Sequence, residues 1–235
     1  MSSSKIAVNE ITSMNIADKI IYESNQLLVV NKPSGLITED NEFEKENVES
    51  IYLEYLKTSI NQPFLGIPHR LDKVTSGVLI FAKKRGSLKK LNRWFEQRKI
   101  RKTYLAIVNN KPPKEQGVLI NYLEKDLVKK IGLVVDKNKP AAKKAVLEFQ
   151  IIGTHELGYL LEIKPQTGRY HQIRTQLAFL GCPIIGDIKY GSKQPYLEGQ
   201  IALHAKSIEL PESINNSPLL FEADLPLSEL WNQFL

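Results

Sequence analysis

The stretch "GIPHRLDKVTSGVLIFAKK", residues 66–84, predicts a charged loop that runs directly into a buried strand. One carboxylate, Asp72, lies between an arginine and a lysine, immediately before the apolar run. Continuous apolar residues of this length are typical of a strand that is covered on both faces. A single acid among bases is either a structural ion pair or a group that takes part in a reaction.

Composition places the chain among ordinary globular proteins. Its 235 residues are 42% hydrophobic, which is enough for a sizeable core. No signal peptide and no run of about 18 apolar residues is present, so we expect a cytoplasmic protein. Cys182 is the only cysteine, and its apolar surroundings favour a small buried side chain over a reactive thiol. The four histidines lack metal-ligand spacing, so we expect neither a metal nor another cofactor.

Positive charge is concentrated in one part of the sequence. Residues 82–144 contain 19 Lys and Arg against five Asp and Glu, whereas the remaining residues contain 13 against 21. A polyanion gains affinity from each phosphate that is neutralised, so this asymmetry indicates a phosphate-binding surface. The alternative is a set of solvated faces that keep the protein soluble, and charge alone does not decide between the two.

Local patterns predict a strand-rich chain with a few helices. Ser87 is the expected N-cap of the second helix, and Gly181 is the expected end of the third. No repeat or linker is visible, so we expect one α+β domain over residues 20–235, preceded by an N-terminal extension of residues 1–19. Strands are expected within residues 20–31, 77–83, 102–109, 117–121, 130–136, 145–153, 159–166, 201–210 and 218–226, and helices near 47–60, 85–99, 168–181 and 227–235.

Four stretches form one larger pattern. They are "VVNKPSGL" at 29–36, "HRLDKVTSGVLIFAKK" at 69–84, "RKTYLAIV" at 101–108 and "IKPQTGRYHQIRTQLAFLGCPIIGDIKYG" at 163–191. Together they resemble the RluA family of pseudouridine synthases. The resemblance runs from about residue 20 to residue 210 and implies a mixed, largely antiparallel sheet flanked by helices. The segment before the first strand is too short for the S4-type RNA-binding domain of many relatives, so we expect none.

The resemblance also implies a reaction and a partner. Such an isomerase cleaves the N1 glycosidic bond of a uridine in RNA, rotates the uracil and rejoins it through C5. Asp72 matches the essential carboxylate, and an ionised acid suits glycosidic cleavage that uses no metal. Whether it attacks the sugar, attacks the base or removes a sugar proton stays open. The expected partner is a structured ribosomal or transfer RNA, with no membrane and no small-molecule cofactor, and the expected state is a monomer.

Further site residues follow from the same resemblance. Arg174 matches the basic residue that pairs with the catalytic aspartate and keeps it ionised by lowering its pKa. Tyr104 matches the tyrosine that packs against the target base and handles the C5 proton. Arg70 matches an arginine that helps to expel the base from the RNA stack. The remaining expected substrate-binding residues are His69, Ile163, Arg169, His171 and Gln172.

Each of these residues also has a purely structural interpretation. If these residues have no role in a reaction, Asp72 is a surface ion-pair partner and Arg174 is a solvated residue on a helix. Tyr104 and Ile163 are then ordinary core residues. A non-catalytic RNA-binding module is the second hypothesis for the whole chain, since basic and aromatic residues alone support it. A protein kinase is excluded by its missing motifs, and a glycoside hydrolase because no second acid accompanies Asp72 in the stretch at 69–84.

Two features depart from the family pattern. The acidic segment "ITEDNEFEKENVES", residues 37–50, replaces a His-Pro segment that many relatives have. Because its acids repel phosphate, we expect this segment to lie away from the RNA. Gln176 stands where a histidine is common.

Overall fold

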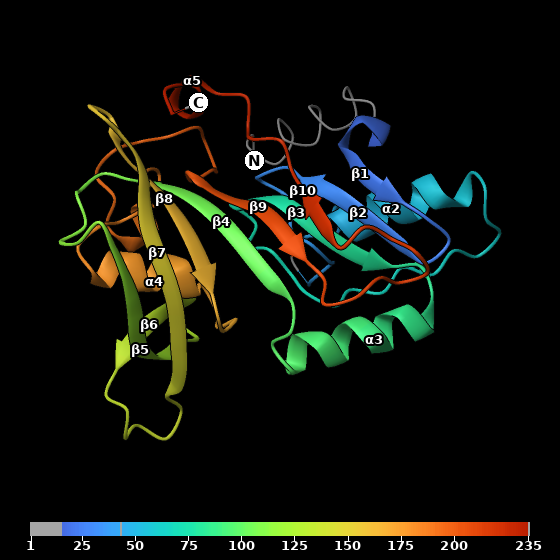
Figure 1. Ribbon diagram of the computed structural model, residues 1–235, viewed down its shortest axis with the longest axis horizontal. Coiled ribbons are helices and arrows are strands. Elements are labelled where there is room, and N and C mark those ends of the chain that lie inside the picture. The colour runs from blue at the N-terminus through green and yellow to red at the C-terminus, as the bar shows by residue number, and fades with distance from the viewer. Residues whose placement is uncertain (1–15, 43, 235) are drawn as a thin grey trace. The chain divides into compact units, whose positions relative to one another are not determined.

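The structure is a computed structural model that describes residues 16–42 and 44–234 (Figure 1). The chain divides into two compact units, which are Met1–Ile100 with Ala205–Leu225, and Arg101–His204 with Pro226–Leu235. They are called unit 1 and unit 2 below, and the single domain expected for residues 20–235 stays a prediction. Of the expected N-terminal extension, only the 3-10 turn η1 (Ile16–Lys19) lies within the described residues.

The sheet of unit 1 carries the strand that the opening stretch predicts. Its order is β1 (Ile20–Glu23), β2 (Leu27–Lys32), β3 (Ser76–Ala82) and β9 (Leu203–Glu209), of which residues 205–209 belong to this unit. The short β10 (Leu220–Glu222) pairs antiparallel with β9. Gly77 lets β3 approach the backbone of β9 closely, because a Cβ at Gly77 would lie only 2.2 Å from the carbonyl oxygen of Ala205.

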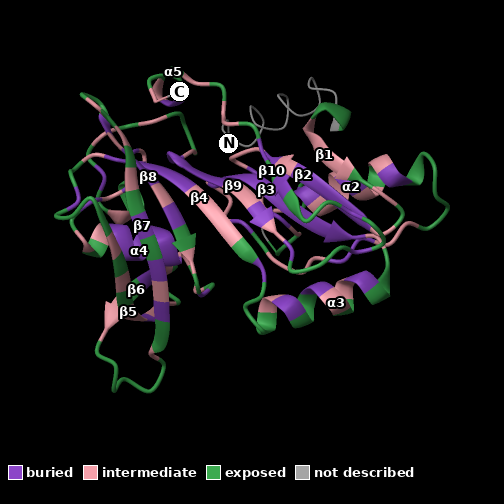
Figure 2. Ribbon diagram, in the orientation of Figure 1, coloured by how far each residue is buried: buried purple, intermediate pink, exposed green. Residues whose placement is uncertain are grey.

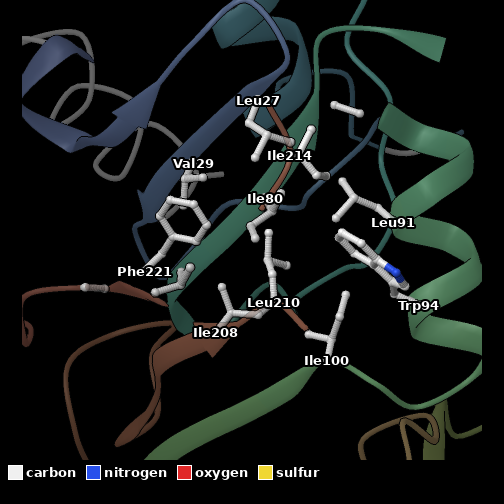
Figure 3. Packing of buried hydrophobic residues seen from close by; sticks show 13 residues of the cluster. Leu27, Val29, Ile80, Leu91, Trp94, Ile100, Ile208, Leu210, Ile214 and Phe221 are labelled. Atoms are coloured by element: carbon white, nitrogen blue, oxygen red, sulfur yellow. The ribbon is translucent and has the colours of Figure 1, made fainter. Parts of the chain in front are cut away.

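Two helices cover the two faces of this sheet. Helix α3 (Arg85–Glu96) places Leu91 and Trp94 in a cluster with alternate residues of β2 and β3 (Figure 3). On the other face, Tyr52 of α2 (Val48–Lys57) packs against Phe81, with ring centroids 6.5 Å apart. Figure 2 accordingly shows β2 and β3 mostly buried. The uninterrupted apolar run in the sequence is therefore explained by helices on both sides.

The two α-helices described for unit 1 begin in different ways, and only α2 has a side-chain N-cap from its own sequence. Asn47 caps α2, its side chain accepting the N–H of Ser50 while the Ser50 hydroxyl receives the N–H of Asn47. The predicted N-cap at Ser87 is wrong, because α3 begins at Arg85 with Lys84 as its N-cap residue. The Ser87 hydroxyl instead donates to the side chain of Gln26. Ser87 therefore bonds to a residue distant in sequence and does not cap the helix.

The sheet of unit 2 is a set of antiparallel neighbours. Its order is β4 (Arg101–Val108), β8 (Gly158–Pro165), β7 (Lys143–His155), β5 (Gln116–Asp126) and β6 (Ile131–Val135). Strands β5 and β7 expose many residues, whereas β4 is buried at its C-terminal half. The predictions of an α+β class and a mixed, largely antiparallel sheet are confirmed.

Helix α4 (Gln172–Phe179) packs against β5 and β6 in unit 2. The amide nitrogen of Gln176 donates to the carbonyl of Leu119 and to the side chain of Asn121, which joins α4 to β5. Gly181 follows the C-cap residue Leu180 with a φ of 83°, as expected for a helix-ending glycine. The turn η2 (Ile188–Tyr190) and the terminal helix α5 (Glu229–Asn232), capped by Ser228, complete the unit. Among the described residues, no helix is long and apolar enough to cross a membrane.

Candidate active site

In unit 1, the loop that carries Asp72 is tied by its backbone to the "KPSGL" loop after β2. The N–H of Gly35 donates to the carbonyl of Lys73 over 2.8 Å, and the Ser34 hydroxyl donates to the carbonyl of Val74 over 2.7 Å. Thr38 exchanges two bonds with the backbone of Leu71 through its hydroxyl. Two of the four quoted stretches therefore form one interlocked structure, in which half-buried Asp72 has a defined backbone position.

Lys32 lies beneath this structure and is fully buried. Its Nζ donates to the carbonyls of Pro33 and Leu36, each over 2.8 Å, and to that of Lys73 over 3.3 Å. Burial lowers the pKa of Lys32 to about 7, and the negative charge of Asp72 acts in the opposite direction. Sequence reasoning did not single out this lysine. The available signal was a lysine between the apolar run "LLVV" and a Pro-Ser-Gly turn.

His69 and Arg70 precede Asp72 and have different surroundings. The Nε2 of His69 accepts the N–H of Ile80 over 3.1 Å, and its ring stacks on Phe95 with centroids 5.0 Å apart. Arg70 is exposed, and its Nε lies 2.6 Å from a carboxylate oxygen of Glu39. His69 is thus held between β3 and α3, while Arg70 reaches toward the acidic segment.

That acidic segment contacts the basic neighbours of Asp72. Besides the pair of Glu39 with Arg70, Lys73 donates to Glu44 over 2.6 Å. An isolated bridge between Ile37 and Asn47 closes the segment at its base. The acids therefore contact Arg70 and Lys73, which lie two residues before and one residue after Asp72.

In unit 2, Tyr104 and Ile163 are brought together as predicted site residues. They are directly opposite each other in the antiparallel pair of β4 and β8, so their side chains share one face of the sheet. Ile163 is fully buried and also faces Phe149 of β7, whereas Tyr104 is half-buried. This strip is a buried apolar part of the sheet with the half-buried Tyr104 at its edge.

Lys102 is a second residue that sequence reasoning missed. It lies two residues before Tyr104 on β4 and so shares its face of the sheet. Burial lowers its pKa, and its Nζ lies 3.8 Å from where a Cβ on Gly168 would be. The signal was the period of two in "KTY", which places a cation beside the tyrosine.

The loop before α4 is organised by Gln172, which is buried. Its Oε1 accepts the hydroxyl of Thr167 and the N–H of Arg169, and its Nε2 donates to the carbonyl of Val146. The side chain of Arg169 donates through Nε to the carbonyl of Lys144. Gln172 therefore braces the loop, and Arg169 lies against β7.

His171 is the N-cap residue of α4 and has a φ of 50°, which is strained for a residue other than glycine. Its Nδ1 lies 2.8 Å from the hydroxyl of Tyr190, and its ring stacks on Tyr170 with centroids 3.8 Å apart. The Tyr190 oxygen also accepts the N–H of Gly132 over 2.6 Å. His171 thus joins α4 to η2 and to the start of β6.

Arg174 lies in the first turn of α4 and is only 5% exposed, which excludes a solvated helix arginine. Its Nε and Nη2 donate to the two carboxylate oxygens of Asp187 over 2.7 and 2.9 Å. Asp187 is 1% exposed, and the guanidinium carbon lies 4.8 Å above the ring of Tyr190. Asp72 belongs to unit 1 and Arg174 to unit 2, and the predicted pair between them stays a prediction.

Possible metal ligands and the single cysteine were also located in the structure. Among residues 16–42 and 44–234, no three His, Cys, Asp or Glu side chains lie close enough together to hold a metal ion. Cys182 is buried, and burial raises the pKa of its thiol. The prediction of a small buried side chain at this position is confirmed.

Comparison with known proteins identifies the family. Residues 26–179 match the RNA pseudouridylate synthase family. The ribosomal large subunit pseudouridine synthase C of Rickettsia bellii is 37% identical over 211 residues, which cover 88% of this chain and 68% of that protein. An uncharacterized RNA pseudouridine synthase of Haemophilus influenzae is 34% identical over 84% of each chain. The structure of human RNA pseudouridylate synthase domain containing 4 has the same fold, with a TM-score of 0.76 and 24% identity over 95% of this chain and 93% of that one. This chain therefore belongs to the RNA pseudouridylate synthase family and is an isomerase.

Proposed function

We propose that the protein converts a specific uridine of large-subunit ribosomal RNA into pseudouridine, with Asp72 as the essential carboxylate. The bond between N1 of uracil and C1′ of ribose breaks, the base turns, and a bond forms between C5 and C1′. The proton on C5 leaves and N1 gains a proton, so that the product is an isomer of the substrate. The target base must leave its stack before this reaction takes place.

The placement of Asp72 is the observation that carries this proposal. Its loop is bonded through backbone groups of Leu71, Lys73 and Val74 to the loop after β2. A carboxylate on so well-defined a backbone is suited to a role that requires fixed geometry. Lys32, buried beside this loop, lies close enough to Asp72 for the two groups to interact electrostatically.

Unit 2 supplies the other two proposed catalytic groups, Tyr104 and Arg174. Tyr104 stacks on the extruded uracil beside the apolar wall of Ile163, and its phenol exchanges the C5 proton. Arg174 supports the charged form of Asp72. The proposed RNA-binding residues are His69, Arg70, Ile163, Arg169, His171 and Gln172.

Exposed basic residues in both units support binding to RNA. Lys89 and Arg93 are exposed on α3 in unit 1, and Lys143 and Lys144 are exposed at the start of β7 in unit 2. Lys90 differs from them, because it pairs with Glu212 over 3.0 Å. We expect the exposed lysines and arginines to contact phosphates without reading sequence.

The choice of RNA rests on the relatives. Several similar proteins, such as that of Rickettsia bellii, are named for the large ribosomal subunit. We therefore propose large-subunit ribosomal RNA as the substrate, with transfer RNA as the alternative. Mapping pseudouridines in total RNA from cells with and without this gene distinguishes the two, because only the true target loses its modification.

The catalytic role is tested by changing Asp72 to asparagine, which keeps the shape and removes the charge. We expect Asp72→Asn to abolish pseudouridine formation while RNA affinity and fold stay close to wild type. Asp18→Asn is the matched control, since Asp18 is an exposed aspartate of the same unit. Wild-type turnover by Asp72→Asn would contradict the proposed role of Asp72. RNA binding without turnover by the wild-type protein on every RNA tested would favour a non-catalytic RNA-binding module.

A further inference from the structure

We propose, building on the function proposed above, that Asp187 is a positioning residue of the isomerase site that orients Arg174 and balances its charge. The two side chains form a buried ion pair through two hydrogen bonds, of 2.7 and 2.9 Å. Neither the sequence patterns nor the family resemblance pointed to Asp187. It acts through Arg174 and not on the RNA itself.

The geometry of the pair fixes which part of Arg174 serves the reaction. A guanidinium has five N–H groups in one plane, and two bonds to one carboxylate fix the orientation of that plane. Asp187 takes the edge formed by Nε and Nη2. Contacts of Arg174 with reacting groups therefore come from Nη1 and from the second N–H of Nη2. Asp187 thereby selects the edge that Arg174 presents.

The charge balance allows Arg174 to be buried before RNA arrives. A guanidinium that is 5% exposed needs an opposite charge close by, because desolvation of an unpaired cation is costly. Asp187 supplies that charge from within unit 2. Arg174 is therefore held in position in advance, which reduces the reorganisation needed in the reaction.

The segment that carries Asp187 is closely packed. Gly186 has a φ of 85°, and a Cβ there would lie 2.6 Å from the Cβ of Tyr196 and 2.8 Å from the carbonyl oxygen of Gln200. On the far side of η2, the Tyr190 ring lies 4.8 Å from the guanidinium carbon of Arg174, and its hydroxyl accepts the N–H of Gly132. Residues 186–190 thus hold Arg174 from two sides, one through charge and one through an aromatic face.

The test uses steady-state kinetics of the full-length protein on the RNA identified by pseudouridine mapping. Asp187→Asn removes the charge, and Asp187→Glu keeps it but shifts the carboxylate by one methylene. We expect each to lower kcat by roughly 10- to 100-fold, as displacement of a catalytic group does, while KM for RNA changes by less than about threefold. Asp136→Asn, at an exposed aspartate of the same unit, is the control and keeps wild-type kcat.

The outcomes separate this inference from the proposed function. All rates are corrected for the folded fraction measured by circular dichroism. Wild-type kcat in both Asp187 variants, or a loss confined to KM, overturns the positioning role. Failure of both variants to fold would assign Asp187 to the stability of unit 2 alone and also overturn it. Absence of pseudouridine formation by the wild-type protein, or full activity of Asp72→Asn, is instead a failure of the proposed function.

Discussion

Asp72 and Arg174 each lie near a buried partner of opposite charge, but the two surroundings differ in kind. In unit 1, the buried group is the lysine. Lys32 donates to the carbonyl of Lys73 in the loop that carries half-buried Asp72, and to the carbonyls of Pro33 and Leu36 in the neighbouring loop after β2. In unit 2, the candidate itself is buried, and Arg174 is bonded side chain to side chain with Asp187. The loop of Asp72 is placed through backbone hydrogen bonds, whereas Arg174 on its helix is placed through its side chain.

The largest expected effect on stability comes from breaking the ion pair of unit 2. Arg174→Met leaves the carboxylate of Asp187 buried and unpaired, so we expect a loss of about 3 to 5 kcal/mol in the free energy of unfolding. Asp72→Asn affects a half-buried residue, and we expect a change below about 1 kcal/mol. Urea denaturation of both variants checks this contrast, and equal losses would remove the distinction between the two surroundings.

The same two variants sharpen the comparison in activity. If Arg174 acts by supporting Asp72, the losses of Arg174→Met and Asp72→Asn are strongly non-additive in a double-mutant comparison. Single-turnover rates of the two single variants and the double variant measure the coupling. Losses that simply add would contradict the predicted pair of Asp72 with Arg174.

The next effect concerns Lys32 in unit 1. Lys32→Met leaves the carbonyls of Pro33, Leu36 and Lys73 without this donor, and we expect a loss of about 2 to 4 kcal/mol in the free energy of unfolding. Activity should fall as well, because the Asp72 loop loses its bond to the amine. Lys83→Met, at a lysine that pairs with Glu23, is the control in the same unit. A stable, fully active Lys32→Met protein would show that the lysine does not hold the loop.

The charge of Lys32 also predicts a pH dependence. Its pKa is about 7 in the folded protein against an ordinary value of 10.5, so between these pH values the unfolded chain binds more protons. Stability relative to Lys32→Met therefore rises as pH increases from 7 toward 10.5, by at most about 1.4 kcal/mol per pH unit, and is constant below pH 7. Urea denaturation of both proteins at pH 6, 7.5 and 9 measures this difference. No rise above pH 7 would mean that the carbonyl bonds keep the amine charged.

The sequence predicted those elements and contacts that depend on residues close together in the chain, and missed those that depend on distant residues. The apolar run at residues 77–83 and the apolar spacing within residues 47–60 are local patterns, so β3 and α2 were predicted close to their observed bounds. The bond of Ser87 to Gln26 spans 61 positions, and that of Lys32 to the Lys73 carbonyl spans 41. Nothing in the local pattern encodes such pairs, so the N-cap of α3 was wrong and Lys32 was missed.

The candidate site divides in the same way. The family resemblance named Tyr104 and Ile163 separately, and the register of β4 and β8 explains why they belong together. It also named Gln172, whose side-chain amide the structure shows bonded to Thr167 and Arg169 in the loop and to Val146 of β7. Asp187 escaped notice because its partner lies 13 residues earlier, on another element, and its burial is set by the packing of α4 on η2.

A smaller effect separates the two functions of Tyr104. Tyr104→Phe keeps the face on which uracil stacks, worth ~1 to 3 kcal/mol, and deletes the phenol. We expect it to bind substrate RNA normally but to fail in completing the rearrangement, whereas Tyr104→Ala loses both. Tyr159→Phe is the control, because Tyr159 lies at the other end of the same strand pair. Single-turnover rates and RNA affinities decide: wild-type rates in Tyr104→Phe would leave only stacking, and wild-type rates in Tyr104→Ala would remove Tyr104 from the site.

The smallest expected effect on stability lies in the acidic segment beside the Asp72 loop. Glu39 and Glu44 pair with Arg70 and Lys73 through partly exposed side chains, so Glu39→Gln with Glu44→Gln should change the free energy of unfolding by less than about 1 kcal/mol. RNA affinity should nevertheless rise, because two cations next to Asp72 no longer have competing carboxylates.

Salt dependence distinguishes this effect from a general change in charge. Each additional phosphate that Arg70 or Lys73 neutralises should steepen the plot of log affinity against log salt by about 0.7 to 0.9. Glu54→Gln is the control, since Glu54 pairs with Lys57 on α2 in a surface ion pair away from the Asp72 loop. It removes the same kind of charge, so it should raise affinity slightly and leave the slope unchanged. If the double variant shows no greater rise in affinity or slope than this control, the acids do not compete with RNA. Arg70 and Lys73 would then bind RNA equally well with or without Glu39 and Glu44 beside them. The Asp72 loop would then differ from the surroundings of Arg174 in burial, and not in competition between acids and RNA.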